Sequence, residues 1–334
     1  MAKPRVLLIS TGGTITMVKT PSGDLAPCDS ADLLLDRVPE VKTLADVDLL
    51  SLANIDSSNL EPAIWPKLSR ELYKRYRDYD GFVITHGTDT LAYTSAALSL
   101  MVQELGKPVV ITGSQVPLEE IGSDGRANLI NSFRVAVADF AEVAVVFGSQ
   151  IIRGSRAKKT SAFDMQAFTS ANAQPLGTIG LSIKFARESI RRSKRKPMLQ
   201  PFLESSVCLL PVYPGIRPDL VTHVSETHKG LVLEGYGAGN LPTEGPSSLV
   251  PAIQTSTGRG VPVVICTQCL VGSTEMELYR VGRAALQAGA IPAMDMTPEM
   301  ALVKLMWVLG QTDDLPTIDS MMQKSFVGEV HETV

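Results

Sequence analysis

Short apolar runs separated by longer amphipathic stretches fill the first half of the chain. The runs lie at residues 5–9, 47–53, 82–85, 109–112 and 143–148. Each is too short for a helix and is typical of a strand, and the runs at 5–9 and 82–85 are typical of a buried parallel strand. Between two of them, apolar side chains recur every fourth residue from Ile64 to Tyr76, which predicts an amphipathic helix. With further helices expected at 90–105 and 127–140, this alternation predicts a doubly wound, mostly parallel sheet.

The second half alternates in the same way, with a basic segment before it. Strands are expected at 207–213, 230–236, 261–267 and 290–294, and helices at 217–227, 247–257, 276–288 and 298–310. The last helix has Thr297 as its expected N-cap and Pro298 as its first residue. Residues 187–196 are rich in Arg and Lys and precede two prolines, which predicts an exposed linker with a helical piece. We therefore expect an α/β protein with an N-terminal α/β domain at 1–190, a linker at 191–206 and a smaller α/β domain at 207–334.

The composition narrows the class of protein. The chain has 334 residues, of which 44% are hydrophobic and 20% charged, as in a globular protein with a substantial core. Its formal net charge of -4 argues against a nucleic-acid partner, and a solvated linker is the commoner meaning of one short basic run. No apolar stretch approaches the roughly 20 residues that span a bilayer. The apolar run before Thr11 is too short for a secretory signal, so a cytoplasmic protein without a membrane partner is expected.

Neither the cysteines nor the histidines predict a metal site. The spacing of Cys266 and Cys269 suits redox chemistry or a metal, but the pair continues an expected strand and has no second pair nearby. We therefore expect reduced cysteines that act as small buried hydrophobes. Residues 235–240 lack the spacing of a dinucleotide loop, so no nicotinamide cofactor and no metal is expected. The residues considered are Cys28, Cys208, Cys266, Cys269, His86, His223, His228 and His331.

Two threonine-bearing loops follow two of the expected strands. Thr11 precedes two glycines after the first run, and Thr88 and Asp89 follow the run at 82–85. Because ligands of open α/β sheets bind beyond the carboxyl ends of the strands, both loops are candidates to line one cleft. A hydroxyl becomes a nucleophile only when a base removes its proton. A simple turn at the first loop, and N-capping by Asp or Thr at the second, are the alternatives.

Three further strand ends carry polar residues. Asp56 and Ser57 suit the recognition of an α-amino and α-carboxylate pair, whereas Ser58 is also placed to cap the following helix in a capping box with Glu61. Ser114 follows the run at 109–112. Two lysines, at 158 and 159, follow the run at 143–148. A lysine normally faces solvent, but in a partly desolvated cleft beside a carboxylate and a hydroxyl it can serve as a base.

Together these motifs resemble those of a known family. The segments Thr-Gly-Gly-Thr-Ile (11–15) and Gly-Phe-Val-Ile-Thr-His-Gly-Thr-Asp-Thr (81–90) are similar to the two signatures of the bacterial-type L-asparaginases, nearest the cytoplasmic type I group. The similarity extends over nearly the whole chain. It implies hydrolysis of the side-chain amide of asparagine to aspartate and ammonia, without metal or cofactor. It also implies a larger N-terminal and a smaller C-terminal α/β domain, in a homodimer or homotetramer.

The resemblance also assigns roles by position. It implies that Thr11 is the nucleophile that forms an acyl-enzyme, and that Thr88, Asp89 and Lys159 form a cluster that activates the attack or the deacylating water. The residues implied to bind substrate are Asp56, Ser57, Ser58, Thr88, Asp89 and Ser114. One departure stands out: residues 21–27 contain no tyrosine, whereas many relatives carry one there to orient the nucleophilic threonine.

Two other functions remain open. The first is the related amidotransferase subunit that supplies ammonia for a misacylated tRNA. It shares the two-threonine site but carries an extra N-terminal domain, which is not expected here because the first threonine motif begins at residue 11. The second is a non-catalytic amino-acid-binding protein of two α/β domains.

Overall fold

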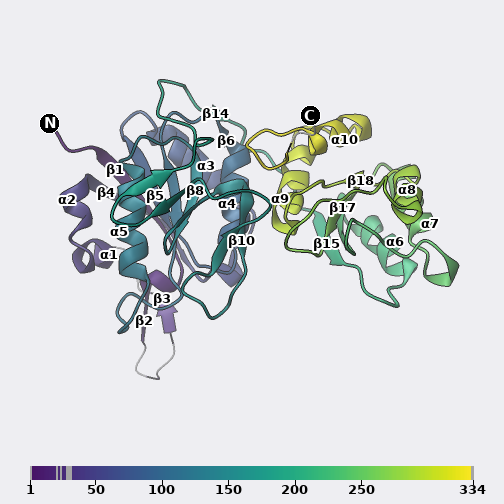
Figure 1. Ribbon diagram of the computed structural model, residues 1–334, viewed down its shortest axis with the longest axis horizontal. Coiled ribbons are helices and arrows are strands. Elements are labelled where there is room, and N and C mark those ends of the chain that lie inside the picture. Colours follow the sequence, from purple (N-terminus) through teal and green to yellow (C-terminus); the bar gives the residue numbers. More distant parts are fainter. Residues whose placement is uncertain (1, 20–21, 23–24, 28–31, 332–334) are drawn as a thin grey trace. The chain divides into compact units, whose positions relative to one another are not determined.

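The computed structural model describes residues 2–19, 22, 25–27 and 32–331 (Figure 1). The chain divides into two compact units, residues 1–201 and 202–334. Each unit combines a parallel or largely parallel sheet with helices, which confirms the expected two-domain α/β fold. No helix in the described part of the chain is long and apolar enough to cross a membrane.

An eight-stranded sheet forms the centre of the N-terminal unit, in the order β13-β12-β9-β8-β7-β5-β1-β4. Five neighbouring strands are parallel and correspond to the five apolar runs: β1 (Arg5–Gly12), β4 (Asp46–Ile55), β5 (Gly81–Thr85), β7 (Val109–Thr112) and β8 (Val143–Phe147). Every residue of β5, β7 and β8 is buried, as the uninterrupted apolar runs predict. Three antiparallel strands extend one edge: β9 (Gln150–Arg153), β12 (Gly177–Ile179) and β13 (Ile183–Phe185).

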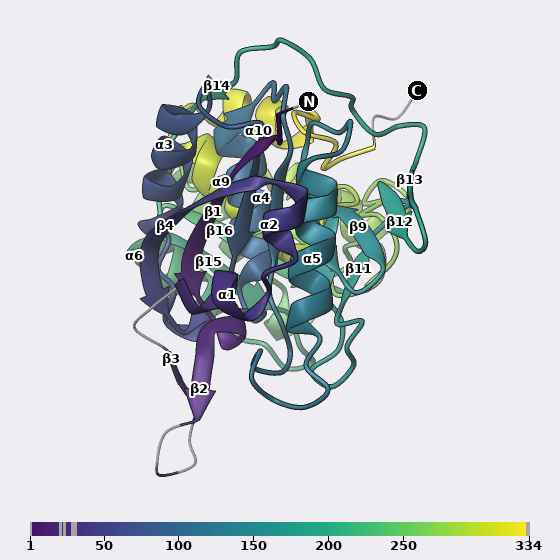
Figure 2. The same ribbon diagram turned by 90° about the vertical axis from the view of Figure 1, so that its left-hand side faces the viewer.

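Helices cover both faces of this sheet (Figure 2). On one face, α5 (Gly125–Ala136) and the short α1 (Asp32–Arg37) and α2 (Val41–Leu44) share a core cluster with alternate residues of the parallel strands. On the other lie α3 (Ile64–Arg75) and α4 (Leu91–Met101), which pack against each other. Two short hairpins complete the unit: β2 (Met17–Lys19) with β3 (Leu25–Pro27), and β10 (Ala157–Lys159) with β11 (Phe168–Ser170).

Two helical segments expected in this unit differ in the structure. The helix expected to reach residue 105 ends at Met101, because β6 (Val102–Gln103) pairs with β14 (Met198–Leu199). The helical piece expected in the basic segment does not form. Instead, the backbone N–H of Arg192 donates to the carboxylate of Asp139 and that of Ser193 to the carbonyl of Gly106, so neither N–H is available for a helical hydrogen bond.

The C-terminal unit contains a four-stranded parallel sheet, in chain order β15 (Val207–Pro211), β16 (Gly230–Gly235), β17 (Val263–Thr267) and β18 (Ile291–Pro292). Helices α6 (Pro218–Thr227), α7 (Val250–Gly258) and α8 (Arg280–Gln287) share one core cluster with its strands. Helix α9 (Pro298–Leu309) packs on the other side, with α10 (Leu315–Gln323) beside it. As predicted, Thr297 caps α9 by accepting from the N–H of Met300 at 3.1 Å.

The cysteines follow the prediction only in part. Cys266 is buried in β17 and Cys208 is half-buried, and neither forms a disulfide. Cys269, expected to be buried, is exposed. The strand ends at Thr267, whose hydroxyl donates to the carbonyl of Gly237 and accepts from the N–H of Cys269, so the chain turns outward there. Cys28 lies outside the described residues.

Candidate active site

Four loops meet at the carboxyl ends of β7, β5, β1 and β4, which are adjacent and parallel. Glycines allow their backbones to touch. Gly13 has φ +85°, and a Cβ added to it would lie 2.3 Å from the backbone nitrogen of Gly87. A Cβ on Gly87 would lie 2.5 Å from the hydroxyl of Ser57, and one on Gly113 would lie 2.3 Å from the carbonyl of His86. The two threonine loops are therefore neighbours because no side chain separates them.

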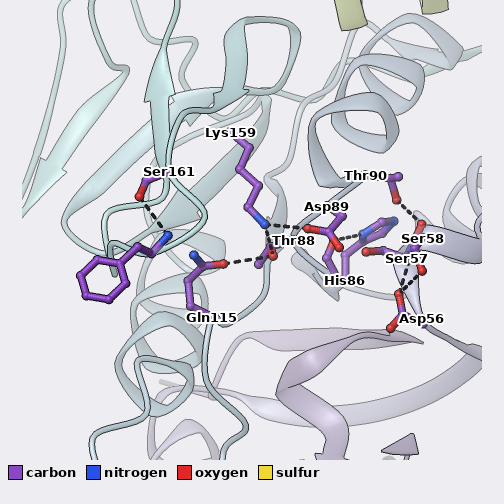
Figure 3. A network of polar contacts seen from close by, with 12 residues as sticks. Asp56, Ser57, Ser58, His86, Thr88, Asp89, Thr90, Gln115, Lys159 and Ser161 are labelled. Carbon is purple, nitrogen blue, oxygen red and sulfur yellow. Dashed lines mark hydrogen bonds and ion pairs between the residues drawn. The ribbon is translucent and has the colours of Figure 1, made fainter. Parts of the chain in front are cut away.

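Thr88, Asp89 and Lys159 form one hydrogen-bonded cluster (Figure 3). The ammonium of Lys159 donates to Thr88 Oγ1 at 2.8 Å and to Asp89 Oδ1 at 2.7 Å. Lys159 reaches this point from β10, and 71 residues separate it from Thr88. The Thr88 side chain is buried and that of Lys159 is 21% exposed, whereas that of Asp89 is 63% exposed. The cluster thus joins a buried hydroxyl to a carboxylate that is open to a ligand.

Gln115 completes this cluster and was not among the predicted site residues. Its Oε1 accepts a hydrogen bond from Thr88 Oγ1 at 3.1 Å. The Thr88 hydroxyl has one proton, so it donates to Gln115 while it accepts from Lys159. The backbone N–H of Gln115 is held by the carboxylate of Asp124 at the start of α5. In the sequence, Gln115 could have been found as a polar side chain at a strand end, because it directly follows Ser114 in the segment 112–115.

N-capping does not account for the second loop. Thr90 occupies the N-cap position of α4 but makes no side-chain cap; its hydroxyl instead donates to the carbonyl of Ser57 at 2.9 Å. Asp89 is engaged by Lys159. The helix N-terminus therefore keeps backbone N–H groups that neither side chain satisfies, and such groups favour an anionic ligand atom.

The expected capping box at residues 58–61 was wrong. Helix α3 begins only at Ile64, and Ser58 lies in a 3-10 turn, η2 (Ser57–Asn59). Asp56 is the cap of this turn: its Oδ1 accepts from the N–H of Ser58 at 2.8 Å and from the hydroxyl of Ser58 at 2.7 Å. These bonds, the N–H first, lower the pKa of Asp56. A carboxylate held in its charged form is suited to pair with a ligand's ammonium group.

Thr11 and Ser114 are more enclosed than the cluster. Thr11 is the penultimate residue of β1 and has 2% of its surface exposed, and its hydroxyl donates to the carbonyl of Thr85 at 2.8 Å. Ser114 is fully buried, and its hydroxyl has no hydrogen-bond partner among the described residues. A carbonyl cannot remove a proton, so the contact with Thr85 orients the Thr11 hydroxyl without activating it. The segment 21–27, which lacks the tyrosine expected from the family resemblance, lies partly outside the described residues.

A buried histidine supports the second loop from behind. His86 Nδ1 lies 2.7 Å from the carbonyl of Gly87, which only accepts, so Nδ1 carries the proton. His86 Nε2 then accepts from the hydroxyl of Thr94 at 2.8 Å, and that hydroxyl accepts from the indole N–H of Trp65 at 3.0 Å. Burial lowers the pKa of His86 to about 4. The ring is therefore neutral at pH 7 and ties the loop to α3 and α4.

Both halves of the chain match domain models of one protein family. Residues 5–191 match the family model "Asparaginase, N-terminal", and residues 206–322 match "Glutaminase/Asparaginase C-terminal domain". The fold and the matched domains define an amidohydrolase of two α/β domains. The chain belongs to the asparaginase family.

Named relatives and solved structures agree with this family. The chain is 38% identical to an L-asparaginase of Thermococcus kodakarensis over 98% of its own length and 99% of the relative's. It superposes on a solved structure of the thermostable L-asparaginase from that organism with a TM-score of 0.93, covering 98% of this chain and 100% of that one at 37% identity. For L-asparaginase I of Vibrio cholerae the TM-score is 0.88, with 34% identity and 99% and 100% coverage.

A second kind of relative is similar at the same level. The chain is 37% identical to a subunit of the glutamyl-tRNA(Gln) amidotransferase of Pyrococcus horikoshii, over 98% of this chain and 77% of that protein. Sequence identity alone therefore does not separate these two activities within the family.

Proposed function

We propose that this protein is an L-asparaginase, which hydrolyses the side-chain amide of L-asparagine to L-aspartate and ammonia. The observation that carries the proposal is that Lys159 contacts both Thr88 and Asp89. The loop that carries Thr11 packs against the backbone of the loop that carries Thr88, at Gly13 and Gly87. The L-asparaginases among its relatives and structural neighbours support it.

The proposed reaction has two steps. The Thr11 oxygen attacks the amide carbon, the carbon–nitrogen bond breaks, and the amide nitrogen leaves as ammonia with the proton from the hydroxyl. The ester on Thr11 is then attacked by water, which yields aspartate and restores the hydroxyl. In this second step Thr88 orients the water and Lys159 relays its proton.

Substrate binding itself would prepare Lys159 for this role. In the structure Lys159 donates to Asp89, as a charged ammonium does. An arriving α-ammonium group would share the exposed Asp89 carboxylate and bring a second positive charge next to Lys159. The two positive groups would repel each other and compete for the Asp89 carboxylate, which loosens the contact between Asp89 and Lys159. Asp56 and Asp89 would thus bind the head group, together with Ser57, Ser58, Thr88 and Ser114 from the surrounding loops.

A tRNA-dependent amidotransferase subunit is the second candidate, because relatives with that name are as similar as the asparaginases. The two functions differ in what a purified chain does alone. An asparaginase releases ammonia from free L-asparagine, whereas an amidotransferase subunit passes ammonia on to a partner acting on misacylated tRNA.

Ammonia release from L-asparagine and from L-glutamine by the purified chain tests the proposal. We expect turnover of asparagine at a rate in the ordinary range for enzymes, about 1–10³ s⁻¹. A pocket discriminates one methylene by about 1–3 kcal/mol, so glutamine should react more slowly by roughly 10–200-fold. Ammonia release only with a partner subunit and tRNA present would favour the amidotransferase. Tight asparagine binding without hydrolysis would favour a binding protein.

The assembly and compartment are also proposals. We propose a homodimer or homotetramer, as the family resemblance implies. We also propose a cytoplasmic location, in line with a structural neighbour from Campylobacter jejuni that is named a probable cytoplasmic L-asparaginase. Sedimentation of the purified chain would distinguish the two assemblies from a monomer.

A further inference from the structure

A second concave surface of the N-terminal unit has no part in the proposed reaction. It is a pocket of about 560 Å³ between the end of α3 and residues 193–197. None of the described residues that line it is acidic. Six of them are cationic: Lys74, Arg77, Lys107, Lys194, Arg195 and Lys196. The chain as a whole carries a net charge of -4, so this pocket concentrates the opposite charge.

The wall formed by the basic segment is fixed in place. The guanidinium of Arg192 spans three backbone carbonyls, Arg195 pairs with Glu104 at 3.0 Å, and Met198 pairs with Gln103 in the short sheet that follows. Residues 193–197 therefore lie on the surface of the N-terminal unit, held at one end by Arg192 and at the other by Met198. The backbone that carries these positive charges is held next to the end of α3, while the lysine side chains themselves are exposed.

Two of the six cations already have partners. Lys107 donates to the carbonyls of Tyr76 and Tyr79, and burial lowers its pKa. Arg195 is paired with Glu104. The other four are exposed and have no acidic partner in the described part of the chain: Lys74, Arg77, Lys194 and Lys196. Four uncompensated charges on one pocket suit an anion that carries more than one negative charge.

The pocket also offers an aromatic face. Tyr76 is buried, with its ring stacked on Phe82 and Lys107 above it, so it forms the floor. Tyr73 is 45% exposed and stacks on no other ring among the described residues. A flat ring of a ligand can stack on such a face.

We propose that this pocket binds a free mononucleotide, with its phosphates on the four unpaired cations and its base on Tyr73. Its volume lies within the range of about 300–1,000 Å³ that holds small organic ligands. A nucleic-acid strand fits less well, because acidic side chains adjoin the pocket. Asp78 and Asp80 lie close enough to influence Lys107, and Glu104 pairs with Arg195, so a longer backbone would meet negative charge.

Titration calorimetry of the full chain tests this, with ATP, AMP, adenosine and tripolyphosphate as probes. We expect ATP to bind more tightly than AMP and both to bind far more tightly than adenosine, with affinity that falls as salt rises. Tripolyphosphate should bind through the phosphate half of the site alone.

Two variants separate the halves of the site. Lys74→Gln with Arg77→Gln should raise the Kd for ATP by about tenfold or more, since two charges near the phosphates are lost. The matched control is Lys67→Gln with Arg70→Gln, which removes two exposed cations from α3 outside the pocket and should leave the Kd unchanged. Tyr73→Leu should weaken ATP binding and leave tripolyphosphate binding unchanged.

Three results would overturn the proposal. The first is no heat from millimolar ATP with protein whose circular dichroism shows it folded. The second is an equal loss of affinity in the pocket variant and its control. The third is binding of single-stranded RNA in preference to ATP, with a site of several nucleotides, which would make the pocket part of a nucleic-acid surface.

Discussion

Acidification should destabilise the N-terminal unit through His86, and the magnitude follows from the structure. The imidazole is fully buried, and its two nitrogens are satisfied only in the neutral form. Its pKa is lowered from 6.5 to about 4 on folding. Because the folded state resists protonation, the unfolded state binds the proton first as the pH falls. Stability is therefore complete above about pH 6.5 and is lost as the pH falls toward 4.

The shift of about 2.5 pKa units corresponds to about 3 kcal/mol at most, at 1.36 kcal/mol per unit. Between pH 7.5 and 4.5 the loss should be about 2.5 kcal/mol of unfolding free energy. Urea denaturation across this range measures it, with His86→Gln as the comparison, because a glutamine amide offers a donor and an acceptor but does not titrate. The difference between the two proteins removes the contribution of the carboxylates.

His223→Gln is the matched control, since His223 is exposed on α6 in the other unit. It should follow the wild-type pH dependence. If wild type and His86→Gln lose stability in parallel from pH 7.5 to 4.5, or if NMR shows the His86 ring titrating near 6.5, the neutral buried ring described above is wrong.

Three further substitutions test other parts of the structure. Lys159→Met should reduce kcat for asparagine by about 10²–10⁴-fold, the usual contribution of a positioned acid or base, with unchanged circular dichroism. Gly13→Ala should abolish activity and lower the melting temperature, because the new Cβ would lie 2.3 Å from the backbone of Gly87, which cannot rotate away. Lys304→Met should cost about 3–5 kcal/mol in urea denaturation, because it leaves the carboxylate of Glu329 buried without its partner at 2.7 Å.

Each of these substitutions has a control that would expose a false interpretation. Lys184→Met removes an exposed lysine from β13 and should not change kcat. Gly122→Ala imposes the same backbone strain at φ +83° with nothing within 4 Å of the new Cβ, so it should cost only about 1–2 kcal/mol. Adding Glu329→Gln to Lys304→Met should recover part of the loss. Equal effects of a variant and its control would contradict the contact described.

The parallel strands and their loops were predictable because each depends on local sequence. An uninterrupted apolar run such as 109–112 can only be buried, and glycine-rich loops mark where the strands end. The antiparallel strands β9, β12 and β13 were missed, because they are three or four residues long and no residue of β13 is fully buried. Their pairing comes from tertiary contacts that no short window contains.

The site was predictable as a set of candidate positions but not as contacts. The sequence could not decide whether a lysine at 159 faces solvent, because its partners Thr88 and Asp89 lie about 70 residues away along the chain. For the same reason the sequence marked the segment 112–115 as a strand end with polar side chains but did not assign Gln115 to the site, because its role depends on its contact with Thr88. Ser58 was expected to cap a helix, whereas in the structure Asp56 caps a short turn that contains Ser58. The two motifs look alike in the sequence until the first residue of the helix is known.

The central claim is that Thr11 carries the acyl group while Thr88, with Asp89 and Lys159, serves its hydrolysis. Acid quenching of Lys159→Met during turnover of L-asparagine, followed by mass spectrometry of proteolytic peptides, tests it most directly. We expect an added aspartyl group on the peptide that contains Thr11, absent when Thr11→Ala is introduced as well. An aspartyl group on the peptide that contains Thr88, or undiminished ammonia release by Thr11→Ala alone, would contradict it.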